Sequence, residues 1–254
     1  MKTTLLSGVI FAAVATVAPI LAAAPATAQP PSPRQERVAF AKGASSATIK
    51  GQVKGDETVD YVVRAGAGQT ISVSIKPSNP SNYFNVLPPD SPDAAMFVAQ
   101  TADPYTGVLP ADGDYKVRVY LMRNAARRGA VSAFTLTVGI TGKALAPLPA
   151  SKDAVVAGTH FHATGQITCV PMPYGDKAPK KCDAGVIRRG TDGTATVEVS
   201  LGTAGKRRIL FVKGKPEVSD SMEKMTVTRQ GDVTVVTFES GERHEIPDAL
   251  VIGG

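Results

Sequence analysis

The chain has 254 residues, of which 43% are hydrophobic and 20% are charged, and its formal net charge is +6. This composition argues against a disordered polyelectrolyte and against a bundle of membrane helices. With 24 Gly, 19 Pro, no Trp and 6% aromatic residues, the chain is rich in turns, which favours many short strands over long helices. Three His and two Cys are too few for multi-ligand zinc modules, iron–sulfur clusters or Cys-rich scaffolds.

The first 28 residues have the pattern of a secretory signal peptide. One basic residue precedes an apolar run, and the next charged residue is Arg34. The run ends in Ala26-Thr27-Ala28, so we expect cleavage between Ala28 and Gln29 and export to the periplasm or the medium. An uncleaved anchor helix is the alternative, although two prolines in the run disfavour it. No later segment resembles a membrane span.

Composition divides the rest of the chain into two β-rich domains. A Pro-rich lead-in at 29–35 precedes a first domain at 36–142, and a linker at 143–150 precedes a second domain at 151–254. Each domain has the size of a small β-sandwich or barrel. The sequence therefore predicts an all-β protein, with two antiparallel sandwich or barrel-like domains after a cleaved signal peptide.

Alternation of apolar and polar residues marks strands in the first domain. It appears at 71–76, 116–121 and 134–140, and a period of two is typical of a strand with one buried face. Turns rich in Gly and Asp separate these segments, as in an antiparallel sandwich. Residues 77–105 are rich in Pro and have few alternating positions, so we expect a long loop there.

A basic segment lies between the strands expected near 121 and 134. It reads Arg123-Asn124-Ala125-Ala126-Arg127-Arg128-Gly129. The planar guanidinium group suits carboxylates, and arginine is enriched at interface anchor positions. Two interpretations stay open, a partner-binding loop and a solvated loop that keeps an exported protein soluble. Nucleic acid is disfavoured because stacking aromatic residues and a basic nucleic-acid-binding motif are both missing.

The second domain has the same strand-like texture with a different sequence. Residues 197–201 alternate, and Gln230-Gly231-Asp232 is a hairpin signal between two apolar runs. The segment 207–212 carries apolar residues on both faces, which indicates a central strand.

The two cysteines of the chain, Cys169 and Cys182, both lie in this domain. In an oxidising compartment we expect them to form one disulfide that closes a short loop. The alternative is a metal site shared with His160 and His162, but no acidic or further His ligand is arranged around these residues.

The sequence contains no recognisable catalytic motif. It lacks a Gly-x-Ser-x-Gly elbow, a Ser-x-x-Lys set, a His-Glu-x-x-His pair and a phosphate-binding Gly loop before a helix. His244 lies in the run Glu242-Arg243-His244-Glu245, where it is a candidate general base or else part of a solvated charge cluster at a strand end. We therefore expect a binding protein and not an enzyme, with no cofactor and no metal.

Short motifs spread over about 36–141 are shared with one known family. They are Val38-Ala-Phe40-Ala-Lys42-Gly43-Ala-Ser45-Ser46-Ala47, Gly51-Gln-Val-Lys54-Gly55, Gly68-Gln69 with Val73-Ser74-Ile75, Leu109-Pro110-Ala111 with Gly113, Tyr115 and Arg118-Val119, and Arg123-Asn124 with Ala126-Arg127. On these motifs the first domain resembles the periplasmic inhibitor of g-type (goose-type) lysozyme. The resemblance implies an antiparallel β-sandwich whose end loops block the active-site cleft of a lysozyme.

The resemblance also implies a set of partner-binding residues. These are Arg123, Asn124 and Arg127, beside the turn at Gly113 and Tyr115. Inhibition would combine steric occlusion with pairing of arginine to acidic groups of the cleft.

Two positions depart from the family pattern. The family has Ser-Gly where this chain has Asp112-Gly113, and an aromatic residue where this chain has Asp56. Both changes are expected to add negative charge near the binding end.

The second domain resembles, at Phe161-His-Ala163-Thr164-Gly165-Gln-Ile167-Thr-Cys169 and at its ending, a small module of bacterial secreted proteins of unknown function. The leading hypothesis is an exported bacterial binding protein that occludes a g-type lysozyme. The rival hypothesis is a cell-envelope module that binds peptidoglycan or an acidic surface glycan without catalysis.

Overall fold

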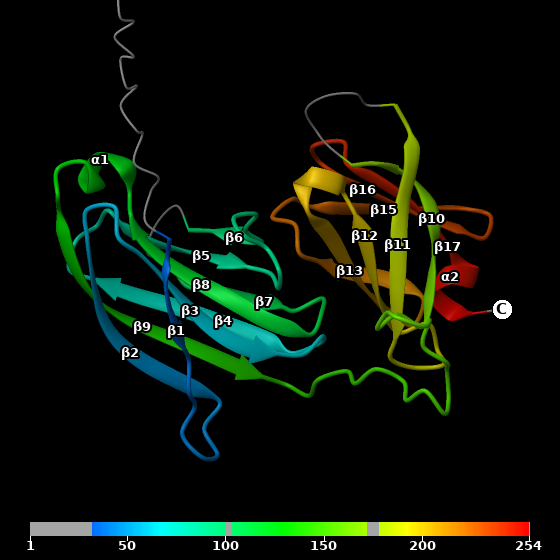
Figure 1. Cartoon of the computed structure of the whole chain (residues 1–254), viewed down its shortest axis with the longest axis horizontal. Coiled ribbons are helices and arrows are strands. Elements are labelled where there is room, and N and C mark those ends of the chain that lie inside the picture. The colour runs from blue at the N-terminus through cyan, green and yellow to red at the C-terminus, as the bar shows by residue number, and fades with distance from the viewer. Residues whose placement is uncertain (1–31, 100–102, 172–177, 254) are drawn as a thin grey trace, which may run out of the picture. The chain divides into compact units, whose positions relative to one another are not determined.

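Strands dominate the computed structural model, which describes residues 32–99, 103–171 and 178–253 (Figure 1). The described residues belong to one compact unit, Pro31–Gly254. We call residues 32–142 the N-terminal half and residues 151–253 the C-terminal half, because each has its own sheets and its own hydrophobic cluster. The predicted signal peptide at 1–28 lies outside the described residues. Among the described helices, none is long and apolar enough to cross a membrane.

Two sheets form the N-terminal half, with strand orders β1-β3-β8-β5-β6 and β2-β9-β4-β7. The strands are β1 (Arg34–Arg37), β2 (Ser46–Lys54), β3 (Thr58–Ala65), β4 (Thr70–Pro77), β5 (Asn82–Leu87), β6 (Phe97–Val98), β7 (Tyr105–Val108), β8 (Gly113–Leu121) and β9 (Val131–Thr141). The pair β1–β3 is parallel, and the other described pairs are antiparallel. The all-β prediction is confirmed, although β1 takes up part of the expected lead-in.

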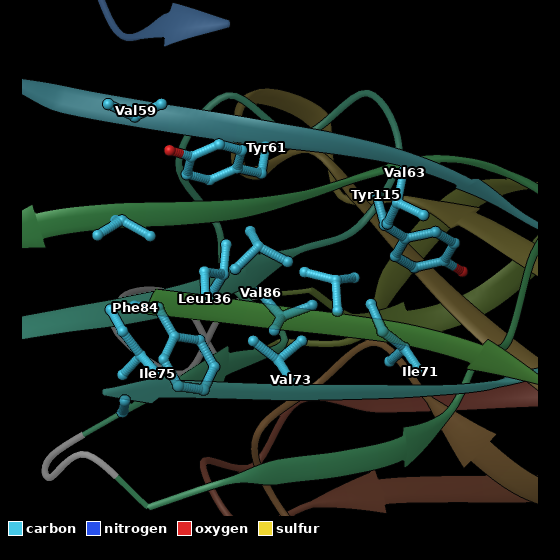
Figure 2. Packing of buried hydrophobic residues seen from close by; sticks show 14 of the residues in the cluster. Val59, Tyr61, Val63, Ile71, Val73, Ile75, Phe84, Val86, Tyr115 and Leu136 are labelled. Atoms are coloured by element: carbon cyan, nitrogen blue, oxygen red, sulfur yellow. The ribbon is translucent and has the colours of Figure 1, made fainter. Parts of the chain in front are cut away.

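Side chains from both sheets meet in one hydrophobic cluster. Tyr61 and Tyr115 come from the first sheet, Ile71 and Leu136 come from the second, and all four are fully buried (Figure 2). The alternating segments of the sequence correspond to β4, β8 and β9, as predicted. Burial of each large apolar side chain contributes roughly 1.5–3 kcal/mol, and a slip of one residue would turn these side chains outward, so this cluster also sets the register.

The long loop expected at 77–105 is wrong in part. β5 pairs with β8 over its whole length, and β6 pairs with β5. Phe84 and Val86 of β5 are 0% exposed and belong to the core cluster. Pro80 precedes β5 and Pro88 follows it, so the prolines bound this strand and do not interrupt it.

The described C-terminal half contains one eight-stranded antiparallel sheet that forms a nearly closed barrel. Its order is β14-β13-β12-β11-β10-β17-β16-β15, built from β10 (Ala163–Val170), β11 (Lys180–Arg188), β12 (Ala195–Ser200), β13 (Lys206–Val212), β14 (Lys215–Ser219), β15 (Met225–Gln230), β16 (Val233–Phe238) and β17 (Arg243–Pro247). The helical elements are short: α1 (Arg123–Ala126) in the N-terminal half, and the 3-10 turn η1 (Gly202–Ala204) and α2 (Asp248–Ile252) in the C-terminal half. The predicted central strand is β13, and the predicted hairpin joins β15 to β16.

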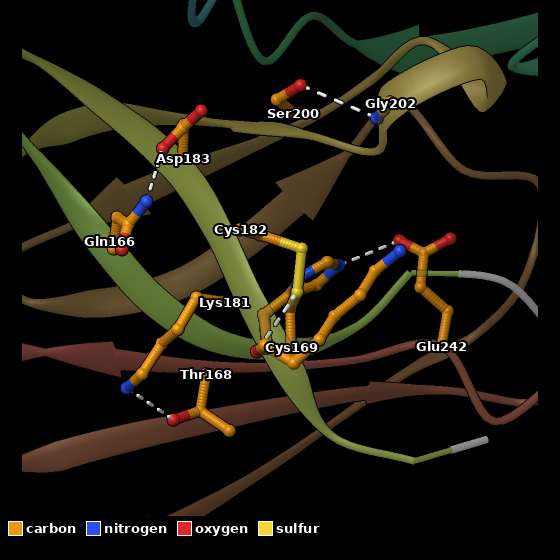
Figure 3. Close-up of a disulfide and its surroundings, with 11 residues drawn as sticks. Gln166, Thr168, Cys169, Lys181, Cys182, Asp183, Ser200, Gly202 and Glu242 are labelled. Atoms are coloured by element: carbon orange, nitrogen blue, oxygen red, sulfur yellow. Dashed lines mark hydrogen bonds and ion pairs between the residues drawn. A yellow bond between two sulfur atoms is a disulfide. The ribbon is translucent and has the colours of Figure 1, made fainter. Parts of the chain in front are cut away.

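A disulfide between Cys169 and Cys182 joins β10 to β11 (Figure 3). The pairing confirms the sequence prediction. Both side chains are buried in the hydrophobic cluster of the C-terminal half. Because the disulfide uses both sulfur atoms, the alternative of a metal site with His160 and His162 does not apply to this fold.

Buried charges connect β13 to the residues that flank β14 and β17. Arg207 donates two hydrogen bonds to Glu242, at 2.7 and 2.8 Å, and one to Asp220 at 3.2 Å. Arg208 pairs with Asp220 as well, at 3.3 Å. His244 lies 2.8 Å from Glu242 through Nε2 and is 0% exposed. The solvated cluster expected at 242–245 is therefore wrong for Glu242 and His244, which belong to this buried network.

Replacing both cysteines tests the disulfide. For Cys169→Ser with Cys182→Ser we expect a loss of about 3 kcal/mol of unfolding free energy, because the unfolded chain regains the entropy of a short open loop. Urea denaturation followed by circular dichroism measures this loss. Wild-type protein under a thiol reductant is the control and should show a similar loss, whereas equal stability of all three forms would contradict the prediction.

Glu242 should make stability depend on acid. Burial raises the pKa of Glu242, but hydrogen bonds and charge from Arg207 and His244 outweigh burial and lower this pKa from the usual 4.5 to about 2. A lowered carboxyl pKa stabilises the fold above pH 4.5, and this contribution is lost as the pH falls toward 2. Glu242→Gln should flatten that part of the pH profile and cost about 3–5 kcal/mol at pH 7, because Arg207 keeps a buried charge without its main partner.

Urea denaturation at a series of pH values from 7 to 2.5 measures both effects on Glu242→Gln. The exposed Glu239 lies three residues away in the chain, and Glu239→Gln is the matched control that should retain the wild-type profile. A Glu242→Gln protein with wild-type stability and slope would show that the network does not stabilise the barrel.

Candidate functional site

The basic segment after β8 folds as a single helical turn, α1. The N–H groups of Ala125 and Ala126 bond to the carbonyl of Met122 at 2.8 and 2.9 Å, and the N–H of Gly129 bonds to the carbonyl of Ala126 at 2.8 Å. Ala125 and Ala126 are buried in the core cluster. Gly129 has φ +65°, a conformation that glycine adopts at little cost at the end of a turn. The two buried alanines therefore anchor the turn to the hydrophobic core, and its arginine and asparagine side chains are exposed to solvent.

Arginine side chains of this turn are exposed and unpaired. Within the described part of the chain, the guanidinium groups of Arg123, Arg127 and Arg128 have neither an ion-pair nor a hydrogen-bond partner, and Asn124 is exposed beside them. Arg118, by contrast, is paired to carboxylates within the protein. The donors of the exposed guanidinium groups remain available for a partner's carboxylates.

A pocket of about 410 Å³ lies beside α1. Arg118 donates to both oxygens of the buried Asp60, at 2.7 and 3.0 Å, and the hydroxyl of Tyr120 donates to Asn85 at 3.1 Å. These bonds hold polar side chains in place on the outer face of the first sheet. The pocket is lined by Gly55, Asp56, Glu57 and Thr58 of the β2–β3 turn and strand β3, by Asn85, Arg118, Tyr120 and Leu121, and by Arg123 and Ala126 of α1.

Arg118 and Tyr120 line the pocket, although neither is among the site residues expected from the sequence. The signal was present, because these residues alternate with the apolar Val117, Val119 and Leu121 and so point away from the core. The pocket that they share with Arg123 also requires the β2–β3 turn and Asn85 of β5, which alternation within one strand does not reveal.

Gly113 and Tyr115 lie at the opposite end of β8 from α1. The strand runs from Gly113 to Leu121, about 26 Å at 3.3 Å per residue, so the structure does not bring these two residues beside Arg123 and Arg127. Tyr115 is 0% exposed, and its hydroxyl donates to the carbonyl of Ala111 at 2.8 Å. Burial raises the pKa of Tyr115. In this geometry the Tyr115 ring supports the core and is not offered to a partner.

Gly113 is covered by a neighbouring proline. Its φ is +151°, and a Cβ built at this position would lie 2.5 Å from Cγ of Pro89. A side chain at this position would therefore collide with the loop that follows β5. The glycine allows this close approach of the loop to β8.

The two acidic departures from the family pattern are separated in the same way. Asp56 lines the pocket beside α1. Asp112 lies at the other end, where its Oδ1 accepts from the N–H of Ala67 at 2.8 Å and its Oδ2 pairs with Arg189 at 2.9 Å. Asp56 therefore adds negative charge beside α1, whereas Asp112 does not.

The remaining candidate ligands of the sequence are engaged in structural contacts. Nδ1 of His162 accepts from the N–H of Arg188 at 3.0 Å, so Nε2 carries the proton and donates to the carbonyl of Leu148 at 2.9 Å. His160 packs on the ring of Phe161, with the ring centroids 4.1 Å apart. Across residues 32–99, 103–171 and 178–253, no group of three His, Cys, Asp or Glu side chains is placed to hold a metal ion.

Comparison with known proteins identifies the N-terminal half. No family model matches the chain. An inhibitor of g-type lysozyme from Escherichia coli (strain K12) is 33% identical over 104 residues, which are 41% of this chain and 78% of that relative. The solved periplasmic inhibitor of g-type lysozyme from Aeromonas hydrophila is 38% identical with a TM-score of 0.41, and covers 42% of this chain and 96% of that one. The Salmonella Typhimurium inhibitor is 29% identical with a TM-score of 0.35, and covers 42% of this chain and 98% of that one. Through the identity and coverage of the Escherichia coli relative, this chain belongs to the family of inhibitors of g-type lysozyme.

Proposed function

We propose that this protein inhibits a g-type lysozyme in the periplasm or outside the cell, and that it does so by binding and without catalysis. The observation that carries the proposal is the display of unpaired Arg123 and Arg127 on the anchored turn α1, in the half that matches named lysozyme inhibitors. Asn124 lies between them as a further polar contact.

Inhibition would follow from the chemistry of a glycosidase cleft. Glycosidases of this kind use carboxyl groups on either side of the scissile bond, and a planar guanidinium pairs well with a carboxylate through parallel hydrogen bonds. A turn that places Arg123 or Arg127 against these carboxyl groups would exclude the sugar chain and neutralise the acid–base machinery. Because Ala125 and Ala126 anchor the turn in the core, little backbone entropy is lost on binding, and the entropic cost falls mainly on the arginine side chains.

The pocket beside α1 gives this surface a concave region that a partner side chain can enter. Arg118, Tyr120 and Asn85 form a floor that is already held by internal hydrogen bonds. Asp56 and Glu57 on its rim favour a partner group that is positively charged or that donates hydrogen bonds. The surface therefore places arginines, which can bind acidic groups of a partner, beside the carboxylates of Asp56 and Glu57. Such a mixed charge pattern contributes more to specificity for one partner than to binding affinity.

The rival function, binding of peptidoglycan or an acidic surface glycan, has less support. A groove of about 360 Å³ on β10–β12 includes Phe161 together with Gln166, Asp183 and Glu198. An aromatic ring beside polar groups is a common composition of ligand grooves. None of the residues that line this groove is basic, and the carboxylate of Asp183 would repel an acidic glycan. Glu198 is already paired with Lys206 and Arg208. The groove therefore does not favour an acidic glycan.

Charge reversal at α1 tests the proposal. For Arg123→Glu with Arg127→Glu we expect an inhibition constant toward a g-type lysozyme that is about 100-fold or more above the wild-type value, because two charge-assisted contacts become repulsive. Hydrolysis of bacterial cell walls by the lysozyme, titrated with the inhibitor, measures the change.

The matched control is Lys42→Glu with Lys50→Glu. It changes the net charge by the same amount at exposed residues of the same half, outside α1 and its pocket, and should leave inhibition close to wild type. Equal losses in the two double variants would show a general charge effect, and full lysozyme activity in excess wild-type protein would exclude the proposed function.

A further inference from the structure

The N-terminal half contacts the C-terminal half at the Asp112 end of β8. Nη1 of Arg189 lies 2.9 Å from Oδ2 of Asp112 and also donates to the carbonyl of Leu145 in the linker. Nε of Arg189 donates to the hydroxyl of Thr196 at 2.9 Å, and that hydroxyl donates to the carbonyl of Pro110 at 2.7 Å. One arginine therefore ties together the segment before β8, the linker and β12.

The arginine of this contact is buried, and its charge is matched by a partly exposed carboxylate. The side chain of Arg189 is 0% exposed, and a buried guanidinium is costly unless a carboxylate compensates its charge. Burial lowers the pKa of Arg189, and the negative charge of Asp112 opposes this effect. Asp112 is itself held by the N–H of Ala67 at 2.8 Å, so the carboxylate is positioned by the N-terminal half before it meets Arg189.

A second ion pair joins the loop that covers Gly113 to the C-terminal half. Nη2 of Arg208 lies 3.5 Å from Asp90, in the loop between β5 and β6. That loop also carries Pro89, which covers Gly113. Between the loop and the C-terminal half lies a pocket of about 650 Å³, lined by residues 88–95, 200–208 and 220–223. The segment around Gly113 is thus flanked by two contacts with the C-terminal half.

We propose that the Asp112 end of the N-terminal half is a docking surface for the chain's own C-terminal half, and that this contact leaves the α1 end as the surface that meets the lysozyme. The second part rests on the proposed function. Asp112 is the residue that makes the contact selective: the serine of the family pattern could accept the Ala67 N–H but would leave the buried charge of Arg189 without a counter-ion.

Hydrogen exchange of the full-length protein tests the docking surface without any lysozyme. In Arg189→Gln and in Asp112→Ser, amides of 66–69 and 109–115 should exchange roughly 100-fold faster than in wild type, the change expected when a buried ion pair loses one partner. Amides of 123–129 in α1 should keep their wild-type rates. The control is Arg229→Gln, which removes an exposed pair with Asp248 in the same C-terminal half and should leave 109–115 unchanged.

The two variants remove the contact from opposite sides. If Arg189→Gln unfolds the C-terminal half, Asp112→Ser still tests the proposal, because it alters only the N-terminal partner. Unchanged exchange at 66–69 and 109–115 in a folded Asp112→Ser protein would overturn the docking surface.

Exchange in the presence of a g-type lysozyme tests the second part. Bound lysozyme should slow exchange at 123–129 and leave 109–115 at its free rate, whereas slowing at 109–115 would overturn the assignment of the α1 end. If lysozyme slows no segment while Arg189→Gln still accelerates 109–115, the proposed function fails and the docking surface is supported.

Discussion

Strand β8 is the element on which both ends of the N-terminal half depend. Its inward side chains, Tyr115, Val117, Val119 and Leu121, are buried in the core. Its outward Arg118 is clamped by Asp60 of β3, directly opposite in the register. With β3 on one side and β5 on the other, β8 cannot slip by one residue without exposing its apolar face and breaking the Arg118–Asp60 pair. The fixed register therefore places Asp112 at one end of the strand and Arg123 at the other.

The net charge of +6 describes this molecule poorly, because many of its arginines are neutralised inside the fold. Arg189, Arg207 and Arg208 each pair with a carboxylate and are shielded from solvent or nearly so. Such pairs add little net stability relative to apolar packing, but breaking one is costly, so they specify which segments meet. The arginines of α1 differ in kind: they are exposed, and no carboxylate of the described chain satisfies them. Position and pairing, more than the total charge, therefore distinguish the arginines that are available to a partner from those that stabilise the fold.

Features that depend on residues close together in the chain could be predicted from the sequence, and features that depend on distant residues could not. Strands β4, β8 and β9 are predictable because alternation is a local property of each strand. The Cys169–Cys182 pair is predictable because the chain has only two cysteines. Strand β5 was missed because prolines on both sides resemble those of a loop, although a proline can bound a strand without breaking its ladder.

The contacts that the sequence did not reveal are between residues far apart in the chain. The charged neighbours of His244 in the sequence suggest a position near the surface. In the structure, however, Glu242 pairs with Arg207, and His244 is buried in contact with Glu242. The Arg189–Asp112 pair spans 77 residues, and neither residue carries a local sign of its partner. Likewise the motifs place Gly113 and Tyr115 near Arg123 in sequence, while an extended strand separates them in space.

The charged groups at the two ends of β8 differ in burial and in pairing. At the Asp112 end, the buried guanidinium of Arg189 has to be matched by a carboxylate, which the partly exposed Asp112 supplies. The α1 end keeps its charges hydrated and unpaired, which costs little in the free protein and leaves their pairing energy for a partner. A basic protein is not steered over long range toward a partner of the same sign. Under the proposed function, recognition at α1 would therefore have to come from local complementarity between its guanidinium groups, the carboxylate of Asp56 beside them and the groups in the lysozyme cleft.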